Sequence, residues 1–171
     1  MSKIKSNDAQ YWEDRYYNGE TGWDMHQVSP PLQAYFDQVR NKNIKILIPG
    51  CGKGYEAEYL IGLGFKNIHV LDIASQPLID LKSRIGESSN IHFYQADFFD
   101  LDEKFDLILE QTFFCALAPY LRTAYAEKMY QMMNKKGRLV GLLFDLPLNS
   151  RPPYGGHIHE YRTYFEPYFY C

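Results

Sequence analysis

One stretch, residues 44–56 (I-K-I-L-I-P-G-C-G-K-G-Y-E), constrains the fold more than any other part of the chain. Its first half is a run of aliphatic residues that ends at Pro49, which is typical of a strand buried on both faces of a parallel sheet. Gly50, Gly52 and Gly54 follow, and three residues without a Cβ allow a sharp turn that lies against a ligand. A helix is expected next. This order predicts an α/β fold with free backbone N–H groups at the carboxyl end of its sheet.

The spacing of the three glycines argues against two phosphate-binding motifs. A dinucleotide-binding turn, G-x-G-x-x-G, would place its third glycine at Tyr55 instead of Gly54. A P-loop requires Lys followed by Ser or Thr after its last glycine, and here Tyr55 and Glu56 follow. The observed G-x-G-x-G resembles motif I of methyltransferases that use S-adenosylmethionine (SAM). A turn that merely joins strand to helix is the structural alternative.

Composition restricts the partners. The chain has 171 residues, 46% of them hydrophobic, which suits one domain with a single core. Its net charge of −3 gives no basic surface for nucleic acid or an anionic membrane. Cys51, Cys115 and Cys171 are odd in number and far apart, so neither a disulfide framework nor a zinc site is indicated. Without an apolar export signal or membrane span, we expect a cytoplasmic protein that acts on a small molecule.

The first 40 residues are expected to form two helices and an ordered loop, ahead of a core over residues 41–171. Trp12 and Tyr16 lie near one face of a helix over residues 8–17, and Trp23 follows in the loop. Large aromatic rings are rarely left exposed, so this segment either covers a ligand as a lid or simply packs against the sheet. Aromatic faces also stabilise a cation such as the sulfonium of SAM.

Polar residues follow the later strands at the edge where ligands bind. The strands are expected at 67–71, 91–95, 105–109 and 138–144, with helices at 56–63, 77–85, 119–133 and from about 157. Asp72 ends the second strand, 22 positions after Gly50 (72 minus 50), where a carboxylate accepts hydrogen bonds from a ribose. Asp97 and Phe98 follow the third strand and are placed to hold an adenine, although Asp97 is also explained as a solvated loop acid. Gln111 follows the fourth strand, where reacting groups belong.

The tail R-P-P-Y-G-G-H-I-H-E contains the only residues that suggest a metal. His157 and His159 are two positions apart, which does not place them on a single helix face, and no third ligand with zinc-like spacing follows. We therefore expect no metal, and a proline and glycine loop that opens a helix near the substrate mouth.

Several stretches together resemble the thiopurine S-methyltransferase superfamily, especially its thiol and halide methyltransferase branch. They are Y-W-E-D-R-Y-Y-N-G-E-T-G-W-D, I-P-G-C-G-K-G-Y-E, V-L-D-I-A, A-D-F-F, F-D-L-I-L-E-Q-T-F-F-C-A-L-A-P and R-P-P-Y-G-G-H. The resemblance runs over nearly the whole chain. It implies a Rossmann-like class I methyltransferase fold, a mostly parallel sheet with helices on both faces. It also implies SAM as cofactor and S-adenosylhomocysteine (SAH) as product.

The resemblance also implies roles for individual residues. Gln111 matches a position near the sulfonium and the substrate, and is a candidate for substrate positioning. The contacts to SAM that it implies are N-terminal aromatic residues, the glycine turn, a ribose ligand and adenine neighbours: Trp12, Tyr16, Trp23, Gly50, Gly52, Asp72, Asp97 and Phe98. Two positions depart from the family, because Tyr16 is often Trp there and Gln111 is Arg in the thiopurine branch. The acceptor therefore cannot be copied from either branch.

The predicted reaction is an in-line attack of a soft nucleophile on the methyl group of SAM. A small thiol or thiopurine has a useful thiolate fraction because a thiol pKa is about 8.5, and halide or thiocyanate ions need no deprotonation. No general base is required, and we assign no catalytic residue. A nicotinamide-dependent oxidoreductase and a non-catalytic SAM-binding module are the alternatives.

The end of the chain is expected to be incomplete. Class I methyltransferases usually finish with an antiparallel hairpin, and the sequence stops at Cys171 before such a hairpin forms. The fifth strand would then be a long apolar edge, which predicts either lower stability than a longer form or a dimer through that edge. The oligomeric state stays open.

Overall fold

The computed structural model describes residues 9–170. Residues 1–8 and Cys171, which were part of the predictions above, lie outside the described residues. Its sheet has five strands in the order β3-β2-β1-β4-β5, and all neighbouring strands are parallel. The strands are β1 (Ile46–Pro49), β2 (Ile68–Asp72), β3 (Ile91–Gln95), β4 (Phe105–Gln111) and β5 (Met133–Leu142). The predicted α/β fold with a parallel sheet is confirmed.

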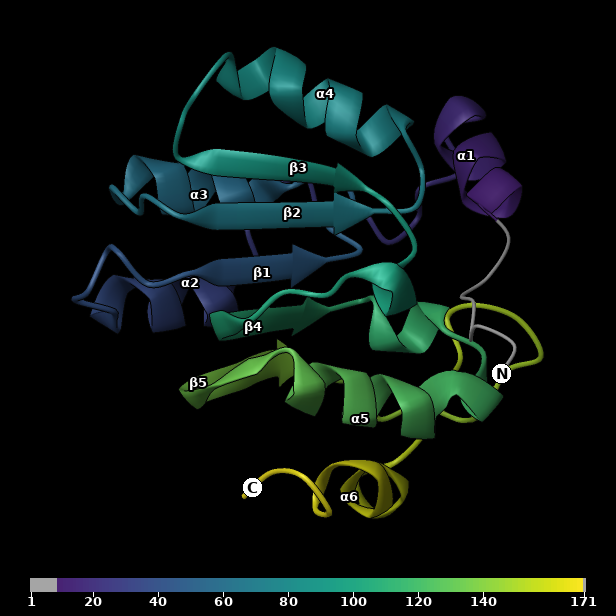
Figure 1. Ribbon diagram of the computed structural model, residues 1–171. Coiled ribbons are helices and arrows are strands. Elements are labelled where there is room, and N and C mark those ends of the chain that lie inside the picture. The colour runs from purple at the N-terminus through teal and green to yellow at the C-terminus, as the bar shows by residue number, and fades with distance from the viewer. Residues whose placement is uncertain (1–8, 171) are drawn as a thin grey trace.

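Helices cover both faces of the sheet (Figure 1). They are α1 (Ala9–Tyr17), α2 (Pro30–Gln38), α3 (Tyr55–Gly62), α4 (Gln76–Ile85), α5 (Arg122–Gln131) and α6 (Ile158–Phe165). Alternate strand residues point to opposite faces, so Ile46 and Ile48 join one core with α2, α3 and α4, whereas Leu47 joins the other with α5 and α6. None of the helices in the described part is long and apolar enough to cross a membrane.

The strand order places a ligand crevice at the ends of β1 and β4. From β1 the chain first moves outward to β2 and β3, and then returns to the other side of β1 with β4 and β5. The connections leave this point in opposite directions, which opens a crevice at the carboxyl edge. The glycine turn and the segment after β4 therefore meet there.

The predicted boundary between the helix over residues 119–133 and the fifth strand is wrong, because α5 ends at Gln131. The fifth strand was expected to start at Arg138 after a turn at Gly137, but β5 starts at Met133 and Gly137 lies within it. The register of β4 and β5 shifts between Phe105 and Leu107, and a Cβ at Gly137 would lie 2.9 Å from the Phe105 carbonyl oxygen. Gly137 therefore permits a close approach of two strands rather than a turn.

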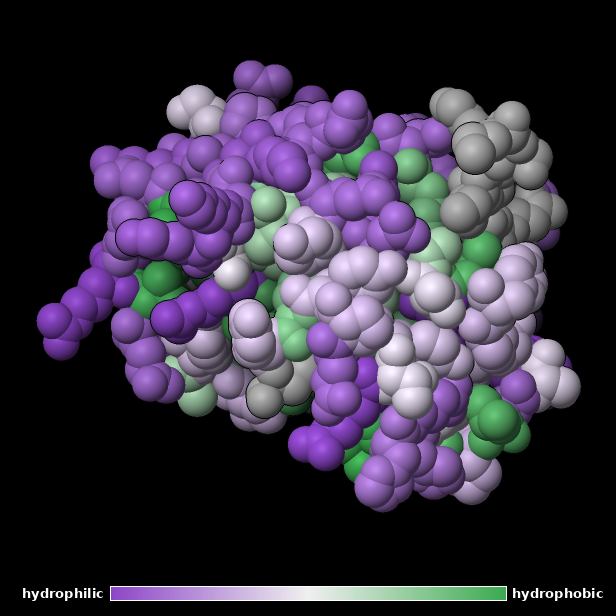
Figure 2. All heavy atoms as spheres, turned by 60° about the horizontal axis from the view of Figure 1, so that its bottom comes forward, coloured by the Kyte–Doolittle hydropathy of each residue, from purple (hydrophilic) through white to green (hydrophobic). Residues whose placement is uncertain are grey.

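The outer strand β5 leaves apolar side chains exposed. Leu142, its last residue, and Leu143 and Phe144, which follow it, are 39%, 37% and 40% exposed. Figure 2 brings the lower edge of Figure 1 forward, and there hydrophobic residues form separate green areas among hydrophilic ones. In the described chain, the only pairing after β5 is an isolated bridge between Leu146 and Gly156.

Candidate functional site

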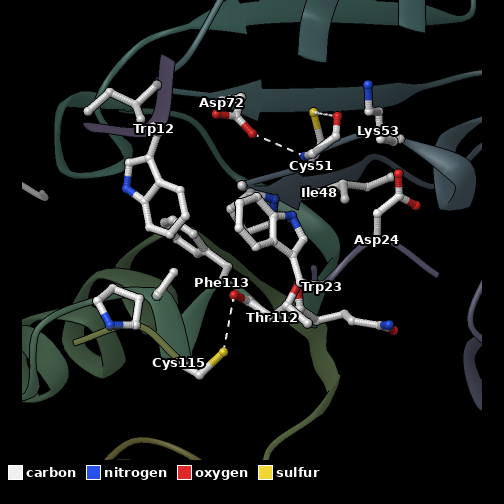
Figure 3. A pocket seen from close by; sticks show the side chains of 18 of the residues that line it. Trp12, Trp23, Asp24, Ile48, Cys51, Lys53, Asp72, Thr112, Phe113 and Cys115 are labelled. Atoms are coloured by element: carbon white, nitrogen blue, oxygen red, sulfur yellow. Dashed lines mark hydrogen bonds between the residues drawn. The ribbon is translucent and has the colours of Figure 1, made fainter. Parts of the chain in front are cut away.

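A cavity of about 440 Å³ lies at the carboxyl edge of the sheet. Its walls include α1 with the loop after it, the glycine turn after β1, the segments at the ends of β2, β3 and β4, and a loop with Pro152 and Pro153. Figure 3 shows Trp12 and Trp23, Asp72, Phe113 and Cys115 around this space. The size suits a small-molecule ligand.

The glycine turn has the left-handed backbone that its sequence predicts. Gly50, Gly52 and Gly54 have φ values of 56°, 51° and 72°. A Cβ at Gly50 would lie 2.3 Å from Cδ2 of Phe113, so the turn requires glycine there for space as well as for backbone conformation. The backbone of the turn can thus lie directly against a ligand.

Asp72 joins the glycine turn to β2 at the cavity wall. Its carboxylate is buried and accepts hydrogen bonds from the Gly52 N–H (3.0 Å) and the Ala74 N–H (3.0 Å). Burial raises the pKa of Asp72 to about 6, against the effect of these hydrogen bonds. A carboxylate has about four acceptor positions, so the group can accept a further donor, such as a hydroxyl group.

Four aromatic side chains of the N-terminal segment line the cavity: Tyr11, Trp12, Tyr16 and Trp23. Trp23 meets Trp12 and Tyr16 edge to face, with ring centroids 5.6 and 5.9 Å apart. Helix α1 itself has no buried residue, but its Glu13 accepts hydrogen bonds from the backbone N–H (2.7 Å) and the hydroxyl of Ser75, where α4 begins. Both predicted roles of the segment are compatible with this position, because the rings face the cavity while Glu13 ties α1 to the core.

The segment after β4 forms another wall. Thr112 has a φ of 60°, an unusual value for a residue with a branched side chain, and Phe113 lies over Gly50. The Cys115 thiol donates to the Thr112 carbonyl (3.3 Å). Burial raises the pKa of Cys115 to about 12 and that of Cys51 well above its ordinary value, so both thiols stay protonated at neutral pH.

Gln111 projects its amide into the same wall. Its Nε2 lies 3.4 Å from the Met25 sulfur, and its buried Oε1 has no hydrogen-bond partner in the described structure. A buried carbonyl oxygen without a partner is unfavourable, which makes it a natural acceptor for a ligand.

The structure brings nearly all the predicted site residues together. Those that line the cavity are Trp12, Tyr16, Trp23, Gly50, Gly52, Asp72, Phe98 and Gln111. Asp97 is not among the lining residues; its carboxylate accepts from the Phe99 N–H (2.9 Å) and caps the short 3-10 helix Phe98–Asp100. Its proposed contact with adenine stays a prediction.

The sequence analysis did not identify three polar residues that lie around the site. Glu13 lies on an exposed helix, Glu110 within an apolar strand, and Arg122 at the start of α5. Arg122 is fully buried, and its guanidinium donates to Glu160 (2.8 Å) and to the Gly155 carbonyl (2.6 Å). Only Glu110 could have been found from sequence, because a charged residue inside an apolar strand is unusual; the sequence around Glu13 and Arg122 gives no such signal.

The histidines of the tail do not form a cluster. His157 pairs with Asp145, whereas Glu160 pairs with Arg122. Within residues 9–170 no group of three His, Cys, Asp or Glu side chains is placed to hold a metal ion.

Comparisons with known proteins identify the family. The family model of thiopurine S-methyltransferase matches residues 7–170. A probable thiol methyltransferase 2 of Arabidopsis thaliana is 30% identical over 174 residues, which cover 96% of this chain and 75% of that protein. Thiocyanate methyltransferase 1 of Brassica oleracea is 27% identical, with 91% and 71% covered. Thiopurine S-methyltransferase of Francisella tularensis (strain SCHU S4) is 27% identical, with 90% and 77% covered.

Solved structures share the fold at low sequence identity. Burkholderia thailandensis 1,6-didemethyltoxoflavin-N1-methyltransferase, crystallised with 1,6-didemethyltoxoflavin and SAH, has a TM-score of 0.75 at 17% identity, with 93% of this chain and 74% of that chain covered. Magnesium protoporphyrin IX methyltransferase from Synechocystis, with bound SAM, has a TM-score of 0.74 at 14% identity, with 94% and 85% covered. The fold is therefore that of class I methyltransferases. With the family match over residues 7–170, the chain belongs to the thiopurine S-methyltransferase family and is a SAM-dependent methyltransferase.

Proposed function

We propose that this methyltransferase moves the methyl group of SAM to a small soft nucleophile: a thiol, a thiopurine, a halide or thiocyanate. The observation that carries the proposal is a single cavity that contains both the glycine turn with Asp72 and the segment after β4. A cofactor held by the first reaches the second without crossing a protein wall. The relatives named above are methyltransferases, so the oxidoreductase alternative is dropped.

The cofactor side of the cavity comprises residues 50–54, Asp72 and the aromatic rings of the N-terminal segment. We assign the ribose hydroxyls to Asp72, whose carboxylate lies at the cavity wall and can accept a further hydrogen bond. The methionine portion lies along Gly50 and Gly52, and the adenine lies near Phe98 and Asp97. Trp12, Tyr16 and Trp23 enclose the sulfonium end, where aromatic faces favour a cation. We propose that the N-terminal segment, described from Ala9 onward and expected over residues 1–40, covers the cofactor as part of a single domain of residues 1–171.

The acceptor side comprises residues 111–117 with Pro152 and Pro153. Lone-pair electrons of the nucleophile form a bond to the methyl carbon while the bond from that carbon to the sulfonium sulfur breaks. The sulfur keeps the electron pair, and neutral SAH leaves. Cys115 and Cys51 remain protonated and do not compete for the methyl group. The chain contributes alignment and the exclusion of water, with Gln111 as the candidate for positioning the acceptor.

Calorimetric titration with SAM, with SAH and with NADH tests the proposal first. We expect saturable binding of SAM and SAH and no binding of NADH. An acceptor screen with iodide, hydrogen sulfide and a thiopurine follows, with SAH formation as the readout. Binding of SAM without turnover of any acceptor would favour the non-catalytic module, and an absence of SAM binding would remove the cofactor assignment.

We also propose a dimer, formed through the edge of β5, and a cytoplasmic location without nucleic acid or membrane partners. The exposed side chains of Leu142, Leu143 and Phe144 support the dimer, since an unpaired apolar edge strand invites pairing. The net charge of −3 and the free, buried thiols of Cys51 and Cys115 support the location. Sedimentation equilibrium that shows a monomer at micromolar concentration would contradict the dimer, and cell fractionation checks the location.

A further inference from the structure

A buried carboxylate directly behind the acceptor side has no part in the reaction described so far. Glu110, near the end of β4, is 2% exposed. Its neighbours Leu109 and Gln111 line the cavity, and alternation along the strand turns Glu110 to the opposite face, toward α5. A carboxylate in such a place needs hydrogen bonds to compensate for its burial.

Both oxygens of Glu110 receive hydrogen bonds from this chain. Oε1 accepts from the backbone N–H groups of Phe113 (3.0 Å) and Phe114 (2.8 Å), and Oε2 accepts from the Tyr125 hydroxyl. The two backbone donors belong to the turn that follows the strand, so the turn folds around the carboxylate. Gly141 on β5 makes room for it, since a Cβ there would lie 2.5 Å from the Glu110 Cβ.

The 111–114 turn contains a backbone conformation that needs support from the rest of the chain. Thr112 has a left-handed backbone, which L residues with a Cβ adopt only against a steric penalty. Its own hydroxyl donates to the Gln111 carbonyl (2.7 Å), which is a local contact that leaves the turn free to shift as a whole. The contacts of Glu110 with Phe113 and Phe114 anchor it from behind.

A shift of this turn would move side chains that contact both the cofactor side and the acceptor side of the cavity. The Phe113 ring covers Gly50 and meets Phe98 edge to face, with ring centroids 5.3 Å apart. Gln111 and Thr112 line the cavity directly. Effective in-line transfer depends on alignment to within fractions of an ångström, so a small displacement here lowers the rate.

We propose that Glu110 is a positioning residue for methyl transfer: it holds the 111–114 turn so that Gln111, Thr112 and Phe113 form the acceptor side. The inference rests on the proposed function, which assigns the acceptor to this wall. Glu110 itself touches neither cofactor nor acceptor.

The charge of Glu110 changes near neutral pH. Burial raises its pKa to about 7. The groups that face it are Tyr125 of α5 and Cys115 in the 3-10 helix Phe114–Ala116, and the pKa of each is raised, so that both stay neutral. Hydrogen bonds to a charged acceptor are roughly twice as strong as those to a neutral one. The turn is therefore held more firmly above pH 7 than below it.

The single-turnover rate of methyl transfer, with SAM preloaded, tests this in the variant Glu110→Gln. Glutamine keeps the shape and one acceptor oxygen but never carries the charge. The ratio of variant rate to wild-type rate at each pH cancels the ionisation of the acceptor. We expect this ratio to fall about fivefold from pH 6 to pH 8.5, with the SAM dissociation constant changed less than about twofold.

Glu103→Gln is the matched control. Glu103 also accepts a hydrogen bond from a tyrosine, the hydroxyl of Tyr94 (2.8 Å), but lies outside the cavity wall. Its rate ratio should not depend on pH. A single-turnover rate for Glu110→Gln that equals the wild-type rate at every pH would overturn the positioning role.

Amide hydrogen exchange of Phe113 and Phe114 at pH 8 gives a second measurement that needs no turnover. We expect these amides to exchange about tenfold faster in Glu110→Gln and unchanged in Glu103→Gln. Unchanged protection in Glu110→Gln would also overturn the inference. If wild type binds SAM but methylates no acceptor, the proposed function fails, and amide exchange alone decides whether Glu110 holds the turn.

Discussion

The cofactor side and the acceptor side of the cavity are held by different kinds of contact. On the cofactor side, residues 50–54 follow β1 and Asp72 ends the adjacent strand β2; the Cys51 N–H donates to the Leu71 carbonyl (3.0 Å) and the Gly52 N–H donates to the Asp72 carboxylate (3.0 Å). On the acceptor side, buried side chains from distant segments hold the wall in place. Glu110 binds the 111–114 turn from behind, and Arg122 binds the loop of Pro152 and Pro153. The first side thus depends on backbone conformation, and the second on buried charge.

Arg122 shows how the acceptor side is assembled. Its guanidinium lies over the Phe114 ring, 4.9 Å from the centroid, and donates to Glu160 of α6 and to the Gly155 carbonyl. The Tyr154 N–H donates to the Cys115 carbonyl (2.7 Å). These contacts join α5, α6 and the proline loop, although the loop is about 30 residues away in sequence from Arg122. A buried charge of this kind is stable only while its partners stay in place.

Gly50→Ala should have the largest effect, because it disrupts a direct contact between the two sides, that of Gly50 with Phe113. The new Cβ would meet the Phe113 ring at a backbone angle that disfavours any side chain. We expect about 3 kcal/mol of lost stability and no measurable SAM binding, from backbone strain and overpacking together. Gly62→Ala is the control, since a Cβ there meets nothing within 4 Å and alanine favours the helix. Wild-type SAM affinity in Gly50→Ala would refute the assignment of the turn.

Asp72→Asn should affect the cofactor side alone. The amide keeps the shape but loses the charge that strengthens hydrogen bonds from a ribose, so we expect about 30-fold weaker SAM binding. At saturating SAM the rate with the acceptor should stay within about twofold. Asp37→Asn is the control, because Asp37 accepts a hydrogen bond from Tyr59 (2.6 Å) at the surface. Calorimetry showing an unchanged dissociation constant would remove the ribose assignment.

Glu160→Gln should affect the acceptor side alone. Loss of the carboxylate leaves Arg122 buried with a weaker partner, so the proline loop loosens. We expect about tenfold higher KM for the acceptor and about 2 kcal/mol lower stability, with SAM affinity unchanged. Glu166→Gln removes an exposed pair with Arg162 and should change neither quantity. If the SAM and acceptor constants rose together, the two sides would not be separable.

The smallest expected effect is that of His69 on the stability of the fold as the pH falls. His69 on β2 is 4% exposed, and burial, with Lys45 and His92 nearby, lowers its pKa to about 4. An unfolded histidine binds its proton near pH 6.5, so in the range below that the unfolded state binds the proton and the folded state does not. His69 therefore lowers stability by about 1 kcal/mol between pH 7 and pH 5.5.

Glu110 acts in the opposite direction. Its raised pKa means that the folded state binds the proton more tightly, so its contribution to stability declines as pH rises toward 7. Asp72, with a pKa raised to about 6, acts in the same direction as Glu110. The free energy of unfolding of His69→Gln and Glu110→Gln, measured with denaturant from pH 5 to pH 8, distinguishes the contribution of His69 from that of Glu110. Parallel curves for wild type and His69→Gln would contradict the role of His69.

Sequence predicts the cofactor side well because its contacts are local. The strand, the glycines and Asp72 follow one another within 30 residues, and the backbone at each glycine is limited by the absence of a Cβ. The start of β5 was mispredicted since glycine marks a turn in most sequences, whereas Gly137 accommodates an irregular strand pair. That pairing depends on a partner strand that no local pattern reveals.

The acceptor side is harder to predict for the same reason. Arg122 at the start of a helix suggests a solvated surface residue, and only the tertiary contacts with Phe114 and Gly155 show that it is buried. Its position in the sequence placed Gln111 at the carboxyl edge of the sheet, whereas its role in positioning the acceptor came only from the resemblance to a family. Glu110 lies beside it, but a carboxylate at a strand end gives no indication that it faces away from the ligand.

The link between Glu13 and Ser75 bears on how quickly one cofactor molecule replaces another. Helix α1 carries Trp12 and Tyr16 to the cavity, yet it buries no residue fully and is tied to α4 through a single carboxylate. A segment with so few contacts opens at a low free energy, on a faster timescale than the core unfolds. Spent SAH can therefore depart by the detachment of α1 while the sheet stays intact, and the steady-state turnover number would then reflect the residence time of the product.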